Sequence, residues 1–499
     1  MAPYFVRNLV PRREARDDSR RPLLEVLRTI TWTQWALFFS GWLAWTCDAL
    51  DFFSVSLSVT RLQTQFHKDK ASTITQAITL TLLFRSVGAV VFGILSDRFG
   101  RKWPLVVNLL LCAAFELGSS FVTTFKQFLA LRSLFGIAMG GVWGLASATA
   151  LENLPVEVRG LASGVLQQGY AMGNLFAAVI NLRLVPHTSH TWRALFWAAS
   201  GITAFAALVR ALLPESEVFL HAKALERQKG SSTGKKTRLF IRQTTAMLKK
   251  HWLLCIYAVL LMTGFNFLSH GSQDLYPTYL QTTKNFDSYH STVATIIGNC
   301  GAIAYAAYLP TDVLSQVAGQ LPARYQQYIG RRLTIIIFVL LAGSFIPLWI
   351  LPHSFGGLSA GAFWLQFGVQ GAWGVIPIQL AEMSPPGFRA TFPGVTYQLG
   401  NMVSSASAQI EATGGDHLKT TIIKNGKPTI VPDYARVQGI LIGVVAVYII
   451  FLAIIGPENH GSRFEHEGVA FSENTFDSTP PPDDEKLSES PSEDAKEKV

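Results

Sequence analysis

The sequence predicts an all-α membrane protein in which twelve transmembrane helices form two bundles of six. Three observations indicate this fold. Of the 499 residues, 49% are hydrophobic and only 15% are charged, which is too apolar for an ordinary soluble domain. Twelve apolar stretches reach the length of about 20 residues that a helix needs to cross the hydrocarbon core. Finally, a single offset relates the two halves of the chain, as in an internal repeat of six helices.

The N-terminal half divides into a polar segment, 1–34, and a first bundle, 35–214. Segment 1–34 is rich in arginine and lacks a short apolar run, so we expect no cleavable secretory signal. Short polar connections separate the six apolar stretches that follow. These stretches lie near 35–57, 73–95, 104–124, 127–150, 161–185 and 193–213.

A basic cytoplasmic linker, 215–251, is expected before the second bundle, 252–456. The acidic tail 457–499 is dense in proline and serine, and we expect it to be disordered. This tail holds twelve acidic and four basic residues, which leaves a net charge near +17 on the remainder of the chain. The apolar stretches of the second bundle lie near 252–280, 293–320, 333–352, 357–380, 391–412 and 437–455.

The distribution of basic residues predicts the topology. An even number of spans leaves both termini on one side of the membrane. Lysine and arginine concentrate in 1–34, in the linker 215–251 and in two short loops at 98–102 and 331–332, which marks that side as cytoplasmic. Cation excess of this kind is typical of membrane surfaces, so we expect a lipid bilayer and no nucleic acid as partner.

Neither a metal nor a nucleotide cofactor is expected. The cysteines Cys47, Cys112, Cys255 and Cys300 lie in apolar stretches without CxxC or other metal spacing, so a disulfide framework or zinc site is not indicated. The chain also lacks the phosphate-binding pattern G-x-x-x-x-G-K-[ST], so direct coupling to ATP is unsupported.

The repeat shows an offset of 230 residues. Six pairs of marks keep this register: Gly100-Arg101-Lys102 with Gly330-Arg331-Arg332, Trp143-Gly144 with Trp373-Gly374, Glu152 with Glu382, Pro155 with Pro385, Arg159 with Arg389, and Gln168 with Gln398.

The offset is smaller at the start of the bundles, where Trp35 corresponds to Trp252, 217 residues later. About 13 residues are therefore extra in the second half. The expected eighth helix is interrupted by polar residues and a proline in 305–320, which is either an insertion that distorts the helix or an error in the gene model.

Two loop motifs carry a resemblance to a known superfamily. Residues 93–102 read G-I-L-S-D-R-F-G-R-K, which resembles the signature of the major facilitator superfamily between its second and third helices. Arg132 followed by Gly136 and Gly140 is similar to its fourth-helix signature, in which small residues let helices approach closely. The resemblance implies the major facilitator fold and assigns a gating role to six charged residues: Asp97, Arg98, Arg101, Arg132, Glu152 and Arg159.

The stretch 266–278, in the seventh span, gives a more specific resemblance than the two loop motifs. It reads N-F-L-S-H-G-S-Q-D-L-Y-P-T and closely resembles the signature of the fungal lactate/pyruvate permease family, whose members are proton-coupled carboxylate importers of the plasma membrane. This implies import of short mono- or dicarboxylates, of the lactate/pyruvate or malate/succinate type, together with protons. Two alternatives are a superfamily porter for a sugar or a drug, and a carboxylate sensor that does not transport.

We expect the polar side chains in this seventh span to have a function, because burying a polar group in hydrocarbon is energetically unfavourable. His270 and Asp274 lie four residues apart, so a carboxylate can pair with an imidazolium that gains and loses a proton near neutral pH. We predict that they carry the coupled proton; the alternative is a hydrogen-bonded histidine that serves helix packing. At about 100° per residue, Ser272 falls on the other half of the helix as a packing residue, and four others are predicted to bind substrate: Asn266, Ser269, Gln273 and Thr278.

Arg85 lies midway along the second span and is predicted to bind the substrate anion, because a guanidinium grips a carboxylate with two hydrogen bonds. The alternative is an internal ion pair with Asp48 or Asp51 of the first span. These two carboxylates are also candidates for a second proton site. Gln168 and Gln398 are predicted to contact substrate, with interhelical hydrogen bonds as the alternative.

Two further expectations concern the ends and the aromatic residues of the chain. Lysines among the acidic, serine-rich residues of 457–499 would suit turnover machinery that modifies the tail. Trp143 and Trp373 are expected in the core or facing lipid, without a substrate-stacking role.

Overall fold

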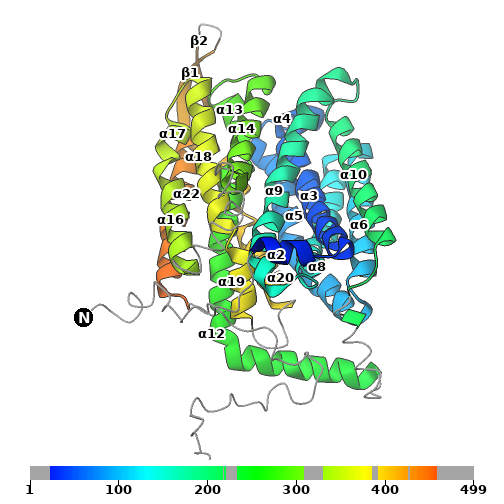
Figure 1. Cartoon of the computed structure of the whole chain (residues 1–499). Helices are drawn as coiled ribbons and strands as arrows, with labels where there is room; N and C mark the ends of the chain where they lie inside the picture. Colours follow the sequence, from blue (N-terminus) through cyan, green and yellow to red (C-terminus); the bar gives the residue numbers. More distant parts are fainter. Residues whose placement is uncertain are drawn as a thin grey trace, which may run out of the picture.

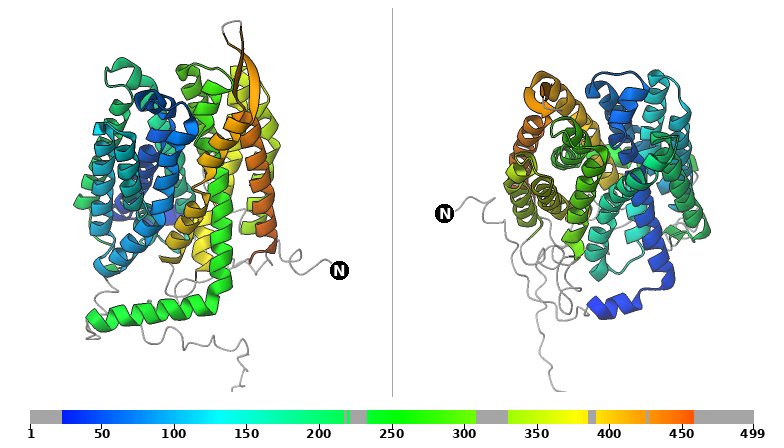
Figure 2. Two further views of the ribbon diagram at one scale, coloured as in Figure 1. Left: turned by 180° about the vertical axis from the view of Figure 1, so that it is seen from behind. Right: turned by 90° about the horizontal axis from the view of Figure 1, so that it is seen from above.

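The computed structural model describes residues 23–216, 219–220, 233–307, 330–384, 391–424 and 427–457. Its helices run lengthwise in two groups that lie side by side, the first drawn in blue to cyan and the second in green to orange (Figures 1 and 2). Within the described ranges, helices account for all twelve predicted spans.

In the first half, capping boxes at Thr31 and Thr124 fix the starts of two spans, and Gly100, at a φ of 99°, ends another. The fourth predicted span is broken at Gly140 and Gly141. The elements are α2 (Leu23–Thr29), α3 (Trp32–Ser56), α4 (Val59–Gln65), α5 (Ala71–Phe99), α6 (Lys102–Phe121), α7 (Phe125–Met139), α8 (Val142–Leu151), α9 (Val156–Arg183), η1 (Val185–His187) and α10 (Trp192–Leu212).

The second half adds a β-hairpin that the sequence analysis did not predict. Its strands pair antiparallel, with Lys419 opposite Pro432. The elements are α12 (Thr233–Gln273), α13 (Tyr276–Thr282), α14 (Ser288–Ala307), α16 (Arg331–Ser344), α17 (Ile346–Ile350), α18 (Phe355–Trp373), α19 (Ile376–Met383), α20 (Thr391–Ser404), α21 (Ser407–His417), β1 (Lys419–Lys424), β2 (Lys427–Pro432) and α22 (Tyr434–Ile455).

Part of the predicted linker 215–251 is helical. The first part of α12 runs across the molecule at the end opposite the hairpin (Figure 1). His251, with φ and ψ of −117° and 25°, marks the kink at which α12 turns into the seventh span. We call the two ends of the molecule the hairpin end and the α12 end. The interrupted segment 305–320 lies outside the described residues beyond 307, as does the tail 457–499 beyond its first residue.

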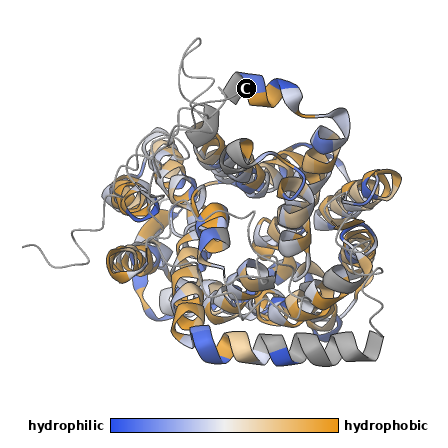
Figure 3. Ribbon diagram, turned by 60° about the horizontal axis from the view of Figure 1, so that its bottom comes forward, coloured by the Kyte–Doolittle hydropathy of each residue, from blue (hydrophilic) through white to orange (hydrophobic). Residues whose placement is uncertain are grey.

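The outer surface suits a bilayer. Six helices or helix pairs in the described ranges are long and apolar enough to cross a membrane: 71–96, 102–121, 125–151, 192–212, 245–282 and 434–455. Figure 3 shows hydrophobic residues along the helices of both halves. On α22, for example, Val444, Val447 and Phe451 are exposed. Several remaining spans are divided into shorter helices or carry more polar side chains, such as Asp48 and Asp51 in α3.

Glycines set the closest helix contacts. A Cβ atom on Gly140, directly after α7, would lie 1.9 Å from the Arg85 carbonyl oxygen of α5, and one on Gly136 of α7 would lie 2.3 Å from that of Thr81. Only glycine therefore fits where α7 crosses α5, as the fourth-helix motif predicts. The two halves meet where α5 packs against α20 and α21, and where α9 packs against α14.

Candidate functional site

The stretch 266–278 lies in α12 and α13, which are separated by a break at Asp274 and Leu275. His270 is 2% exposed. Its Nδ1 is 3.1 Å from Asp274 Oδ2, and its Nε2 is 3.1 Å from Asn401 Oδ1 on α20. Asn401 Nδ2 donates to Gln398 Oε1 at 2.9 Å, so the amide presents its oxygen to the ring. Both ring nitrogens thus face acceptors, an arrangement that a protonated imidazolium satisfies.

The other predicted residues of this stretch are buried within the second half. Asn266 Nδ2 donates to the Tyr397 carbonyl oxygen at 3.3 Å, and Gln273 Nε2 donates to Gln366 Oε1 at 2.7 Å. Ser272 accepts a hydrogen bond from Gln366 Nε2 at 3.0 Å and so joins α12 to α18. Ser269 and Thr278 are 3% and 2% exposed.

Arg85 forms the internal ion pair that the sequence analysis gave as its alternative. Its Nη2 lies 2.7 Å from Asp48 Oδ2, and both side chains are fully buried. The pair is incomplete, because Arg85 Nε and Nη1 and Asp48 Oδ1 have no hydrogen-bond partner among the described residues. Asp51 does not join it; its Oδ2 accepts from Thr203 on α10 at 2.8 Å. Two buried guanidinium N–H positions therefore stay available to an anion.

A second buried ion pair lies within the first half. Arg132 Nη1 is 2.5 Å from Glu116 Oε2 of α6. Arg132, which was predicted to act in gating, is thus paired with a buried carboxylate of the neighbouring helix. Sequence reasoning missed Glu116, although a carboxylate inside the apolar stretch 104–124 is the usual signal for such a residue.

Aromatic rings gather between the two halves around Tyr397 of α20. The centroid of its ring lies 4.7 Å from that of Trp143, in a stacked arrangement, and 5.8 Å from that of Trp373. These tryptophans are equivalent in the repeat, and their indole Nε1 atoms are buried without a hydrogen-bond partner in the described part of the chain. Both side chains are buried, which agrees with the expected core position, but no local sequence pattern reveals that they converge on Tyr397.

Tyr170 of α9 lies near charged groups of both halves. It lies within electrostatic range of Arg85 and of Asp274. Nearby, the ring of Phe52 on α3 is 5.4 Å from that of His270. The central site is therefore built from α3, α5 and α9 of the first half and from α12 and α20 of the second.

The two predicted glutamines each supply a free amide group. Gln398 accepts from Asn401 and keeps its Nε2 without a partner, as does Gln168 of α9, within the described residues. Each of these amides can therefore donate a hydrogen bond to a ligand.

The predicted gating residues divide into those that can be placed and those that cannot. At the α12 end, Arg101 Nη2 lies 3.1 Å from Glu152 Oε1. Their repeat equivalents, Arg331 and Glu382, form the same pair at 2.8 Å. The side chains of Asp97, Arg98 and Arg159 lie outside the described residues.

Hydrogen bonds join the two halves at the hairpin end. Ser72 donates to Asp416 Oδ2 at 2.9 Å, and Thr75 donates to Gln409 Oε1 at 2.8 Å. Both bonds connect α5 to α21. In the described part of the molecule, Arg61 of α4 also donates to the Ser288 hydroxyl of α14 at 3.3 Å, and these polar contacts close this end.

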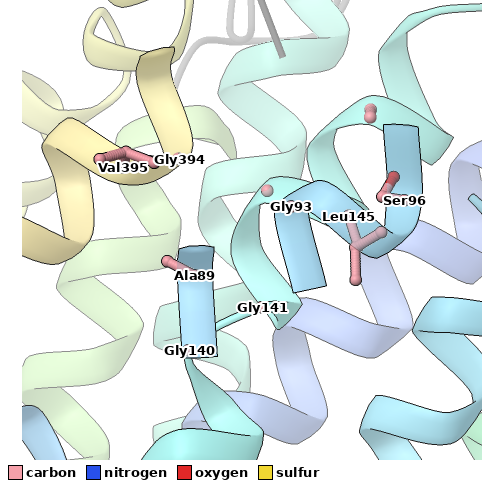
Figure 4. A pocket seen from close by; sticks show the side chains of 10 residues that line it. Ala89, Gly93, Ser96, Gly140, Gly141, Leu145, Gly394 and Val395 are labelled. Carbon is pink, nitrogen blue, oxygen red and sulfur yellow. The ribbon is translucent and has the colours of Figure 1, made fainter. Parts of the chain in front are cut away.

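Toward the α12 end, a small cavity of about 30 Å³ separates the halves (Figure 4). It is lined by α5, α8, the α7–α8 connection and α20, and none of its described lining residues is charged. Its small size and apolar lining distinguish it from the central site. The lining residues include Ala89, Gly93, Ser96, Gly140, Gly141, Leu145, Gly394 and Val395.

No group of three or more His, Cys, Asp or Glu side chains within the described ranges could hold a metal ion. All four cysteines are free thiols.

Three comparisons relate the chain to known proteins. A family model described as Major Facilitator Superfamily matches residues 36–408. A carboxylic acid transporter protein homolog of Saccharomyces cerevisiae is 35% identical over 452 residues, covering 88% of this chain and 71% of that protein. The cis,cis-muconate transport protein of Acinetobacter baylyi is 23% identical over 386 residues, covering 76% and 87%. The xylose transporter XylE of E. coli, solved in a partially occluded inward-open conformation, superposes with a TM-score of 0.62 at 16% identity, covering 87% of this chain and all of that one.

Proposed function

Because the chain belongs to the Major Facilitator Superfamily, we propose that it is a secondary active transporter that imports a short-chain carboxylate together with a proton. Membership confirms the predicted fold of twelve helices in two bundles and makes the chain a membrane transport protein rather than an enzyme. The predicted resemblance to carboxylate permeases is confirmed by the relative from yeast.

The proposal that the substrate is a carboxylate rests on Arg85, whose hydrogen-bonding groups are only partly paired. Arg85 holds one oxygen of Asp48 and keeps two buried N–H positions free among the described residues. A substrate carboxylate can form the two parallel hydrogen bonds that a guanidinium favours and so displace Asp48. The amide groups of Gln168 and Gln398 are candidates for contacts to the rest of the substrate.

The proposal that a proton is transported together with the substrate rests on His270. Its position between Asp274 and Asn401 suits the imidazolium, and loss of the proton would remove the donor from one of the two bonds. Arg85 belongs to the first half and His270 to the second. Binding of anion and proton between them therefore links the halves, and their rocking about this midplane site gives alternating access.

We assign the hairpin end to the outside and the α12 end to the cytoplasm. The transverse part of α12 carries the exposed cations Arg242, Lys249 and Lys250, and such residues favour the cytoplasmic side. The resemblance to the lactate/pyruvate permeases supports location in the plasma membrane.

Counterflow in proteoliposomes tests the substrate class. Vesicles preloaded with unlabelled lactate, succinate or glucose are diluted into the same labelled compound. We expect exchange of lactate or succinate and none of glucose. Exchange of glucose alone would favour the sugar porter, and carboxylate binding without any flux would favour the sensor.

The proton role is tested with His270→Gln, which we expect to abolish the pH dependence of lactate uptake, because the substituted amide cannot titrate. His290→Gln is the matched control. His290 also contacts an aspartate, Asp287, but it is 53% exposed and lies in the first turn of α14. Unchanged pH dependence in the His270 variant would contradict the proton role.

A further inference from the structure

Glu411, on α21, is a buried carboxylate that the transport scheme above does not use. Its side chain is fully buried. Its Oε2 accepts a hydrogen bond from Gln438 Nε2 of α22 at 2.9 Å, and its Oε1 lies 3.5 Å from the Ser407 hydroxyl. Both neighbours are neutral.

Glu411 shares this with Asp51, whose partner is the Thr203 hydroxyl, and differs from the three other buried carboxylates. Asp48 pairs with Arg85, Glu116 with Arg132 and Asp274 with His270. In the described part of the chain, no basic group lies within ion-pair distance of Glu411. An ionised carboxylate without a partner is unfavourable in a membrane interior. The protonated acid fits better, because its O–H can donate to Ser407 while Oε2 still accepts from Gln438.

Glu411 lies close to the His270–Asp274 pair and on the helix that reaches the hairpin end. A Cβ atom on Gly271, next to His270, would lie 3.2 Å from Glu411 Oε1, and Asp274 lies within electrostatic range. Asp416, five residues further along α21, bonds Ser72 at the hairpin end. Glu411 thus lies between that end and the His270–Asp274 pair.

Among the described elements, α5, α22 and α12 pack most extensively against α21, which carries Glu411. On α12 the titratable neighbours are Asp274 and its partner His270. On α22 the facing group is the neutral Gln438. On α5 the polar groups that reach α21 are the hydroxyls of Ser72 and Thr75, which bond Asp416 and Gln409 instead.

We propose that Glu411 is a proton-binding residue of the transport cycle; this inference rests on the proposed proton-coupled transport. When the hairpin end is open, a proton moves from external water to a Glu411 carboxylate oxygen. It stays there while the contacts of Ser72 and Thr75 close this end, and it then moves to the Asp274–His270 pair. This transfer leaves Glu411 ionised; the pair then releases the proton to cytoplasmic water, and Glu411 is protonated again from outside.

Glu411→Gln tests the proposal in proteoliposomes that contain the full chain. The substitution keeps the shape of the acid and removes the exchangeable proton. Two quantities are measured: lactate counterflow at equal pH on both sides, and lactate accumulation driven by an inward gradient of one pH unit. One coupled proton supports an accumulation of about tenfold at this gradient. We expect the variant to keep counterflow and to lose this accumulation.

Glu25→Gln, at an exposed position of α2, is the control and should keep both activities. Glu411→Asp should retain accumulation with a shifted pH profile. Full accumulation by Glu411→Gln would overturn the proposal. Equal loss of counterflow and accumulation, in a variant that elutes as a folded monodisperse protein, would indicate a structural role and would also overturn it. Absence of counterflow in the unmodified protein would instead contradict the proposed function itself, and this inference with it.

Discussion

Arg85 and Asp48 form a buried ion pair in which each partner keeps unsatisfied groups. Such a pair contributes little net stability, because loss of hydration offsets much of the attraction, whereas removing one partner costs about 3–5 kcal/mol. A guanidinium with one anion bound and further N–H positions free can exchange that anion for another without ever being left unpaired. This property suits a transporter that must release its substrate.

Replacing Arg85 by lysine should weaken substrate binding with little effect on charge. Lysine offers a point charge in place of the planar fork, and loss of one hydrogen bond to a charged group costs about 1.5–3 kcal/mol. We therefore expect the KM for lactate uptake to rise about 10- to 100-fold, as measured from initial rates in proteoliposomes. Arg28→Lys, at an exposed position of α2, is the control; an unchanged KM in Arg85→Lys would contradict bidentate binding.

Asp48→Asn should destabilise the folded protein and make its thermal stability more dependent on bound substrate. The substitution leaves Arg85 buried without its anion, at a cost of about 3–5 kcal/mol. A carboxylate that binds the folded state restores part of the loss by mass action. We expect a lower Tm in detergent and a larger rise of Tm with added lactate than in the unmodified protein. A variant that lactate does not stabilise would show that the anion binds elsewhere.

The sequence identified only some of the charged residues that the structure brings into the interior. Arg85, His270 and Asp274 lie well inside predicted spans, where an ionisable group attracts notice. Glu411 falls near the predicted end of 391–412, but α21 continues to His417, which places this carboxylate in the interior. The convergence of Trp143 and Trp373 on Tyr397 depends on the tertiary arrangement of both halves and has no local signal.

At the scale of elements, the crossing of α5 and α7 depends on glycine. In Gly140→Ala the new Cβ would overlap the Arg85 carbonyl oxygen, so the helices must separate. Overpacking of this kind costs about 1–3 kcal/mol or more, and separation would also displace Arg85. We expect a lower Tm and reduced uptake.

Gly201→Ala on α10 is the matched control, because a Cβ there would meet nothing within 4 Å. Glycine in a helix is less stable than alanine by about 0.5–1 kcal/mol, so this variant should keep or slightly raise the Tm. Equal effects of the two substitutions would show that helix propensity, rather than the close crossing, determines the result.

The spans could be predicted because the thickness of hydrocarbon fixes their length, whereas irregularities within and between them were missed. The break between α20 and α21 near Ser405 and Ala406 has no proline to announce it. The hairpin does have a sequence signal: β-branched residues in 420–423 and 429–431 flank an Asn-Gly dipeptide, a pattern typical of paired strands. It was overlooked because the segment lies between two spans and reads as a loop.

In the whole molecule, the repeat produces equivalent contacts in both halves. Arg101 and Glu152 are 51 residues apart, as are Arg331 and Glu382, and both pairs form. The sequence predicts such equivalence but not which end of the molecule is closed, because the repeat in the sequence is the same whichever end is closed. The bonds between α5 and α21 supply this information: the hairpin end is closed.

Alternating access requires the hairpin end to open during each cycle, so a link across it should stop transport. Thr75 and Gln409 lie in different halves, and their side chains are hydrogen bonded at 2.8 Å. In a background in which Cys255 and Cys300 are replaced by serine, we expect Thr75→Cys with Gln409→Cys to lose lactate uptake after treatment with a short thiol-specific cross-linker. Reductant should restore uptake if the linker is cleavable.

Gln409→Cys with Thr413→Cys provides the matched control, because these residues face each other one turn apart on α21, with side chains 3.3 Å apart. A cross-link there stays within one half and should leave uptake unchanged. The comparison separates loss of relative motion from damage to α21, since both variants share the substitution at Gln409. If the link between the halves forms fully and uptake continues, then substrate does not pass the hairpin end by separation of α5 from α21, and the rocking mechanism is wrong for this protein.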